Sequence, residues 1–168
     1  LIVDDNPGNL RTLETMLRRM GYQDITTTTD PTEVVGFHRV RHFDIILLDV
    51  VMPQMDGLEV LSRLKEVEPD AFLPVLVMTS LTEEEIREEA LAVGAQDFLN
   101  RPFNKTEVLL RIRNILRVRL LNNSLEEQVR ERTRVLEHRT RELQQTRLDI
   151  INRLGMASEY RDNETGLH

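Results

Sequence analysis

Three aspartates stand where apolar runs of the sequence end. Asp4 and Asp5 follow the run at residues 1–3, and Asp49 follows the run at residues 45–48. Both runs predict buried strands, and in a parallel sheet the carboxyl ends of neighbouring strands meet at one edge. Three carboxylates held together there repel one another unless a cation neutralises them, and oxygen ligands of this kind suit Mg²⁺. The spacing therefore predicts a divalent metal site.

Two further polar side chains belong to the same predicted edge. Thr79 ends a fourth apolar run, and Arg101 lies beyond a fifth, directly before Pro102. One aspartate alone would favour a helix cap or a turn residue, but the full set favours a reaction site. A nucleophilic carboxylate, a metal, a hydroxyl donor and a cation are the parts of a phosphoryl-transfer site, in which Asp49 would be the nucleophile.

The first hundred residues alternate short aliphatic runs with segments of helical period, which predicts a parallel sheet with helices on both faces. The predicted strands are residues 1–3, 25–28, 44–48, 74–78 and 97–99. The predicted helices are residues 7–20, 32–41, 58–68 and 83–93. This pattern indicates an α/β fold with a flavodoxin-like, doubly wound sheet of five parallel strands in the order 2-1-3-4-5, whose ligands lie beyond the carboxyl ends of the strands.

A long segment without proline or glycine runs from Asn104 to just before Gly155, and it predicts a continuous helix. Its first part is expected to pack on the sheet as the fifth helix. Farther along, one apolar column recurs every seven residues, at Val129, Leu136, Leu143 and Ile150. The complementary column holds Arg132, Arg139 and Thr146. We therefore predict a weak or adjustable coiled coil, parallel or antiparallel, with a solvated single helix as the alternative.

Charge separates the chain into two parts. The formal charge is −7, but residues 1–104 carry 9 Lys and Arg against 19 Asp and Glu, giving −10, while residues 105–168 carry 13 against 10, giving +3. An acidic globular part argues against nucleic-acid binding, which relies on basic side chains. The absence of cysteine excludes disulfides and thiolate sites. It also fits the cytoplasmic location that we expect. Apolar runs are too short for a membrane helix, so we expect no membrane partner.

Four stretches carry a resemblance to the receiver domain of two-component response regulators, over about residues 1–120. They are VDDNPGN, ILLDVVMPQMDG, VMTS and DFLNRPF. The resemblance implies a phosphoryl acceptor at Asp49, a bound Mg²⁺ and a sensor histidine kinase as phosphodonor. It further implies Asp4, Asp5, Asp49 and the Val51 backbone carbonyl as metal ligands, Thr79 as the phosphoryl contact, and Thr79 and Phe98 as switch residues.

Arg101 departs from the pattern of that family, which normally has lysine at this position. The planar guanidinium cannot place a point charge as an ammonium does. Either phosphorylation continues with altered rate or switching, or the chain has become a phosphorylation-independent dimerisation module. The first alternative is favoured because every other site residue is intact.

The last residues, ASEYRDNETGLH, resemble the opening of the HD-GYP family of metal-dependent phosphodiesterases that hydrolyse cyclic di-GMP. The resemblance implies Glu164 and His168 as early metal ligands of an Fe or Mn centre. The preceding stretch LEEQVRERTRVLE is similar to the stalks that join receivers to output domains. We expect a receiver at residues 1–120, a coiled-coil linker at 121–154 and the start of an output domain at 155–168.

These expectations combine into one functional hypothesis. Phosphorylation of Asp49 would repack the surface around the fourth and fifth helices, and a homodimeric stalk would carry the change to an output domain, expected to be a cyclic di-GMP phosphodiesterase. The 168 residues themselves would regulate rather than catalyse. DNA binding through arginines of the fifth helix is disfavoured, since no recognition motif follows them.

Overall fold

The structure is a computed structural model that describes residues 1–68, 72, 74–80 and 84–165. Its contacts divide the chain into two compact units, Leu1–Asn122 and Asn123–His168. The first unit holds the sheet and its helices, and the described residues of the second, up to Thr165, are the later part of one helix.

Five parallel strands form the sheet of the first unit. They are β1 (Ile2–Val3), β2 (Thr27–Thr28), β3 (Ile46–Asp49), β4 (Val75–Ser80) and β5 (Asp97–Arg101). Their order is β2-β1-β3-β4-β5, and every neighbouring pair is parallel. The predicted doubly wound sheet is therefore confirmed.

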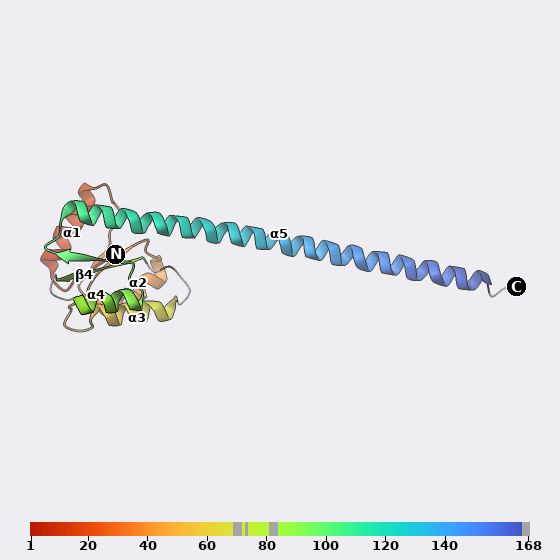
Figure 1. Ribbon diagram of the computed structural model, residues 1–168, viewed down its shortest axis with the longest axis horizontal. Helices are drawn as coiled ribbons and strands as arrows, with labels where there is room; N and C mark the ends of the chain where they lie inside the picture. Colours follow the sequence, from red (N-terminus) through yellow and green to blue (C-terminus); the bar gives the residue numbers. More distant parts are fainter. Residues whose placement is uncertain (69–71, 73, 81–83, 166–168) are drawn as a thin grey trace. The chain divides into compact units, whose positions relative to one another are not determined.

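The helices cover both faces of this sheet. They are α1 (Pro7–Arg19), α2 (Val34–Arg41), α3 (Gly57–Val67), α4 (Glu84–Val93) and α5 (Lys105–Thr165), with a short 3-10 helix at Pro31–Glu33 before α2. Helix α1 and the first turns of α5 lie on one face, and α2, α3 and α4 lie on the other (Figure 1). This arrangement leaves the carboxyl edge of the sheet to the connecting loops.

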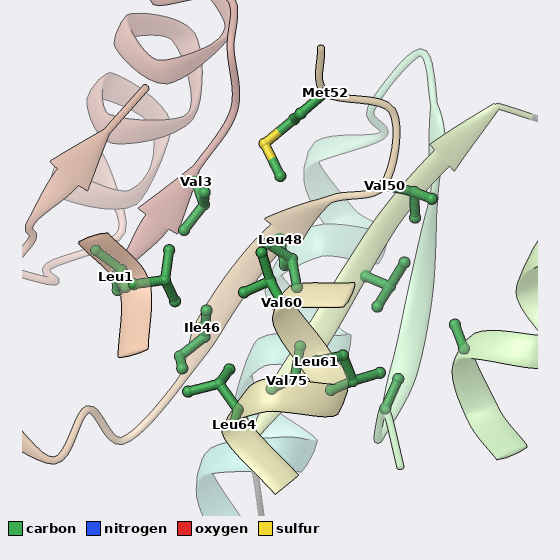
Figure 2. Packing of buried hydrophobic residues seen from close by; sticks show 14 of the residues in the cluster. Leu1, Val3, Ile46, Leu48, Val50, Met52, Val60, Leu61, Leu64 and Val75 are labelled. Atoms are coloured by element: carbon green, nitrogen blue, oxygen red, sulfur yellow. The ribbon is translucent and has the colours of Figure 1, made fainter. Parts of the chain in front are cut away.

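Alternation along the strands creates two separate cores, because successive side chains of a strand point to opposite faces. In β3, Leu47 packs with α1 and α5, while Ile46 and Leu48 pack with α3. Figure 2 shows the second of these cores, where side chains of β1 and β3 meet Val60, Leu61 and Leu64 of α3. Both faces of the central strands are buried, which explains why these strands are apolar without a polar alternate position.

Strand ends differ from the prediction at the edge where polar residues gather. Strand β3 extends to Asp49, which pairs with Met78, and β4 extends through Thr79 to Ser80. Strand β5 extends to Arg101, which pairs with Ser80. The prediction ended these strands at their last apolar residue, whereas the backbone ladder continues under polar side chains. Strand β2, the outermost strand beside β1, begins at Thr27 and is therefore shorter than the predicted 25–28.

Helix boundaries agree with the prediction to within about two residues, with two differences. The predicted start of the fourth helix, at residue 83, lies outside the described residues. Helix α5 continues through Gly155 to Thr165, beyond the predicted end. An interior glycine costs a helix only about 1 kcal/mol relative to alanine, which its neighbours can offset. Among the helices that the structure describes, none combines the length and apolarity needed to cross a membrane.

Candidate functional site

The predicted polar residues meet around one cavity of about 300 Å³ at the carboxyl edge of the sheet. It is lined by Asp5, Asn6, Asn9, Asp49, Val51, Thr79 and Arg101. These residues come from β3, β4 and β5, from the loops after β1 and β3, and from the first turn of α1. Asp4 is fully buried beside this cavity and contacts Arg101. The chain therefore brings together the residues from which the sequence predicted a reaction site.

Asp4 is held in place from three directions. Its carboxylate accepts a hydrogen bond from the Asn6 backbone N–H at 2.9 Å and from Asn9 Nδ2 at 3.0 and 3.1 Å. Arg101 Nη2 also donates to it. Asn6 is the N-cap of α1 and accepts from the Gly8 N–H, so the start of the helix is itself fixed. Asn9 was not among the predicted site residues, although its position in the first turn of α1 places it within reach of Asp4.

Asp49 is a buried carboxylate with a nearby cation. It is 3% exposed, and Arg101 Nη2 lies 3.1 Å from its Oδ2. Burial, reinforced by Asp4 and Asp5, raises the pKa of Asp49 to about 6, against the lowering effects of Arg101 and the Val50 N–H. Its pKa still lies below neutral pH, so the group is mostly an anion there and can act as a nucleophile or a metal ligand.

The three aspartates form a group that could hold a divalent ion. One carboxylate oxygen from each of Asp4, Asp5 and Asp49 lies within 4.8 Å of the others. Asp5 is exposed toward solvent, whereas the other two are buried. A set of oxygen ligands with an open side fits Mg²⁺, which keeps several of its waters. The residues present therefore fit the metal that the sequence predicted.

The loop after β3 requires glycine at position 57. The Gly57 N–H donates to the Val50 carbonyl at 2.8 Å, and Asp56 caps α3 by accepting from the Glu59 N–H at 2.7 Å. A Cβ atom at Gly57 would lie 2.3 Å from the Asp49 backbone oxygen. Asp56 and Gly57 thus fix the loop that follows Asp49, a role that was not predicted from the sequence. An isolated glycine directly after a cap residue is the signal that could have indicated it.

The two predicted switch residues occupy different surroundings. Thr79 is 2% exposed, lines the cavity and pairs with Asn100 of β5. Phe98 does not line the cavity. Two guanidinium groups lie near its ring, Arg87 of α4 at 5.0 Å and Arg111 of α5 at 5.2 Å from the ring centre.

The residues predicted for an output domain lie at the end of the chain. Glu164 falls within α5, where only the backbone is described, and His168 lies outside the described residues. The second unit is a helix that carries the predicted apolar column on its surface. Val129, Leu136, Leu143 and Ile150 are 56%, 62%, 70% and 53% exposed.

Comparison with known proteins agrees with this geometry. Residues 1–113 match the response regulator receiver domain family. The chain is 38% identical to the probable transcriptional regulatory protein TcrX of Mycobacterium tuberculosis, over 70% of this chain and 49% of that protein. It is 33% identical to the cyclic di-GMP phosphodiesterase response regulator RpfG of Xanthomonas campestris, over 98% of this chain and 44% of that protein. The chain thus spans about half the length of these relatives.

A solved structure extends the comparison to the metal. The receiver domain of a sensor histidine kinase from Pseudomonas aeruginosa, with a magnesium ion coordinated in the active site cleft, matches with a TM-score of 0.62 at 29% identity. The match covers 68% of this chain and 93% of that one.

Proposed function

The chain belongs to the response regulator receiver domain family of two-component systems, and on that premise we propose that Asp49 accepts a phosphoryl group in a Mg²⁺-dependent reaction. The observation that carries this proposal is the placement of the Asp49 carboxylate in one cavity with Asp5, Thr79 and Arg101, with Asp4 buried beside it. A nucleophile with a cation and a hydroxyl near it has what acyl phosphate formation requires.

The proposed reaction follows from these positions. A carboxylate oxygen of Asp49 attacks the phosphorus of a phosphohistidine on a sensor histidine kinase, the P–N bond breaks and an acyl phosphate forms. When bound at Asp4, Asp5, Asp49 and the Val51 carbonyl, Mg²⁺ would offset charge on the transferred oxygens. Thr79 and Arg101 line the cavity beside Asp49, where they can contact the phosphoryl oxygens.

Arg101 is compatible with this role despite the lysine that the family normally has. The same nitrogen, Nη2, contacts both Asp4 and Asp49. It therefore presents one positive centre to the two carboxylates, much as a single ammonium group would. The guanidinium also lies near an aromatic ring, with Arg101 Cζ 5.6 Å from the centre of the Phe103 ring. This arrangement supports phosphorylation over a phosphorylation-independent role.

We propose that the signal leaves through α4, β5 and α5. Phe98 contacts Arg87 and Arg111, and Arg111 is also paired with Asp97 and with Glu107 at 2.8 Å. Movement of Thr79 and Phe98 after phosphorylation would change these pairings at the start of α5. The exposed apolar column of α5 would form a homodimer with a second copy of the chain.

The output domain is proposed to be a cyclic di-GMP phosphodiesterase, with Glu164 and His168 as ligands of its Fe or Mn centre. The support is the similarity to RpfG across 98% of this chain, together with the terminal sequence. Within this proposal the receiver occupies residues 1–120, the linker 121–154 and the start of the output domain 155–168, and the enzyme activity belongs to the full-length protein.

Intact mass spectrometry after incubation with Mg²⁺ and a small-molecule phosphodonor tests the acceptor. The parent chain should gain one phosphoryl group, and Asp49→Asn should gain none. Asp24→Asn, which removes an exposed carboxylate outside the cavity, is the matched control and should behave as the parent. Absence of the gain in the parent, with Mg²⁺ binding demonstrated, would instead favour the phosphorylation-independent dimerisation module.

A further inference from the structure

A second group of potential metal ligands lies outside the cavity of Asp49. It consists of His38 and His42 at the end of α2 and Glu68 directly after α3. One ligand atom from each lies within 4.8 Å of the other two. Since helices of this fold run antiparallel to the strands, the group lies at the amino edge of the sheet, opposite the edge that holds Asp49. It takes no part in the proposed phosphorylation.

The separations within this group suit a shared metal better than direct hydrogen bonds. His38 Nε2 is 3.5 Å from one oxygen of Glu68, and His42 Nδ1 is 3.4 Å from the other. Good N–H···O hydrogen bonds are shorter, at about 2.7–3.2 Å. Two ligands placed about 2.0–2.1 Å from a tetrahedral Zn²⁺ lie about 3.4 Å apart. The two observed separations match this spacing, and each imidazole faces a different oxygen of Glu68.

His38 is buried, and its Nε2 faces the Glu68 carboxylate at 3.5 Å without a close hydrogen bond. The residue is 0% exposed, and neither Nδ1 nor Nε2 has a hydrogen-bond partner among the described residues. Burial lowers the pKa of His38, with Glu68 acting in the opposite direction. A buried imidazole that stays neutral offers a lone pair, which is the form that metals bind. The stacked ring of Phe43 at 6.3 Å restricts its movement.

His42 is held in position by an unusual backbone conformation. Its φ is 47°, in the left-handed region, and its N–H donates to the His38 carbonyl at 2.8 Å. This conformation costs a residue with a side chain about 1–2 kcal/mol, and glycine is the usual choice after a helix. The strained turn brings the His42 ring to the Glu68 carboxylate. His38, one helical turn earlier in the sequence, faces the same carboxylate. Strain of this kind is commonly retained at functional sites.

The surroundings leave room for a fourth ligand. The His42 side chain is 64% exposed and the Glu68 side chain 21% exposed, so the group opens to solvent on one side. A cavity of about 280 Å³ beside His42 is lined by Asp24, Arg41 and Asp44 among others. Arg119 lies close enough to oppose a positive charge on His38. The three carboxylates of Glu68, Asp24 and Asp44 outnumber the two guanidinium groups of Arg41 and Arg119, so negative side chains are in excess around the histidines.

From this geometry we propose that His38, His42 and Glu68 form a second metal site, which binds a divalent transition ion of the Zn²⁺ class with solvent as the fourth ligand. Two imidazoles and one carboxylate select Zn²⁺ over Mg²⁺, which prefers oxygen ligands. The ion would join the end of α2 to the end of α3. Both helices pack on the face of the sheet that α4 also covers.

Zn²⁺ titration by calorimetry, with the whole chain in excess Mg²⁺, tests this site. We expect one Zn²⁺ per chain, and loss of at least about tenfold in affinity in His42→Ala and in Glu68→Gln, as removal of even an outer partner of a metal ligand causes. His42 is exposed, so its replacement should leave the fold intact, which circular dichroism would verify. In parallel, Co²⁺ substitution should give the visible absorption of a tetrahedral ion in the parent and not in His42→Ala.

Two controls separate this site from other binding. His138 is exposed and lies outside the group, so His138→Ala is the matched histidine control. It should bind Zn²⁺ as the parent does, and so should Asp49→Asn, in which phosphorylation is expected to fail. Unchanged Zn²⁺ affinity in both His42→Ala and Glu68→Gln, or loss of binding in His138→Ala, would overturn the proposal and leave the group as a histidine–carboxylate ion pair.

Discussion

Asp49 is buried beside two acidic neighbours, Asp4 and Asp5. In the absence of metal, its ionised carboxylate therefore lowers the stability of the folded chain. Its pKa is about 6 in the folded chain, against an ordinary value of 3.8. Below pH 3.8 the group is protonated in both the folded and the unfolded chain, so it imposes no penalty. As pH rises toward 6, the unfolded chain loses this proton first, and the stability of the folded state decreases.

Asp49→Asn is therefore expected to stabilise the metal-free receiver at neutral pH. The gain in the free energy of unfolding should be about 1–2 kcal/mol at pH 7–8, after allowance for solvent screening at the open side of the cavity. The gain should disappear below about pH 4, where both forms are neutral. Urea unfolding in EDTA across this range measures it, with Asp149→Asn, which removes an exposed carboxylate of α5, as the control. A gain that does not depend on pH would contradict the assigned cause.

Residue types and spacing were sufficient to predict which side chains gather at the site. Asp4, Asp5, Asp49, Thr79 and Arg101 all contribute polar groups at strand ends, so a sheet of known order brings them together. The role of Asn9 could not be predicted, because it depends on the angle at which α1 leaves the loop. The bridge that one Arg101 nitrogen makes between two carboxylates depends on side-chain rotamers, which spacing does not determine.

The loop between β3 and α3 is the element on which the position of Asp49 depends. It turns back on its own backbone, so that Gly57 lies against the last residue of β3. Nothing but a hydrogen atom fits there, and the backbone on both sides is held by hydrogen bonds.

Gly57→Ala is expected to destabilise the receiver by about 1–3 kcal/mol, the cost of overpacking, and to reduce phosphoryl uptake by displacing Asp49. Thermal unfolding and intact mass would measure the two effects. Gly36→Ala is the matched control, because nothing lies within 4 Å of an added Cβ in that helix. It should leave uptake unchanged and increase stability by up to about 1 kcal/mol. Equal behaviour of the two variants would refute the steric argument.

The strands and α-helices of the sheet unit were predictable, whereas the ends of the strands and the 3-10 helix at Pro31–Glu33 were not. Hydrophobic periodicity depends only on side-chain polarity. It therefore ended the predicted β4 and β5 too early, where Thr79 and Arg101 are polar. The backbone ladder continues there because hydrogen bonding between strands does not depend on side-chain polarity. Gly155 likewise made the predicted helix too short, because a single glycine weakens a helix without ending it.

At the scale of the whole molecule, the exposed column of α5 is expected to set the oligomeric state. Leu136→Asp places a charge in the middle of this column and should weaken self-association of the 168-residue chain at least about tenfold, because a coiled-coil core excludes charge. Sedimentation equilibrium measures this effect. Gln145→Asp introduces the same charge outside the column and should change association little. A parent chain that is monomeric at high concentration would show that α5 is a solvated single helix.

In the metal-free protein the Arg101 guanidinium contacts Asp4 and Asp49, and it therefore competes with Mg²⁺ for these carboxylates. The guanidinium is tethered at the two carboxylates that the metal must reach, and a tethered cation competes at a high effective concentration whatever the solution contains. Arg101→Ala should therefore bind Mg²⁺ more tightly than the parent in calorimetry, while it accepts phosphate more slowly. Weaker binding would mean that Arg101 mainly keeps the carboxylates in place. If the competition holds, exchange of this one residue among receivers adjusts how much free magnesium each of them needs before it can respond to its kinase.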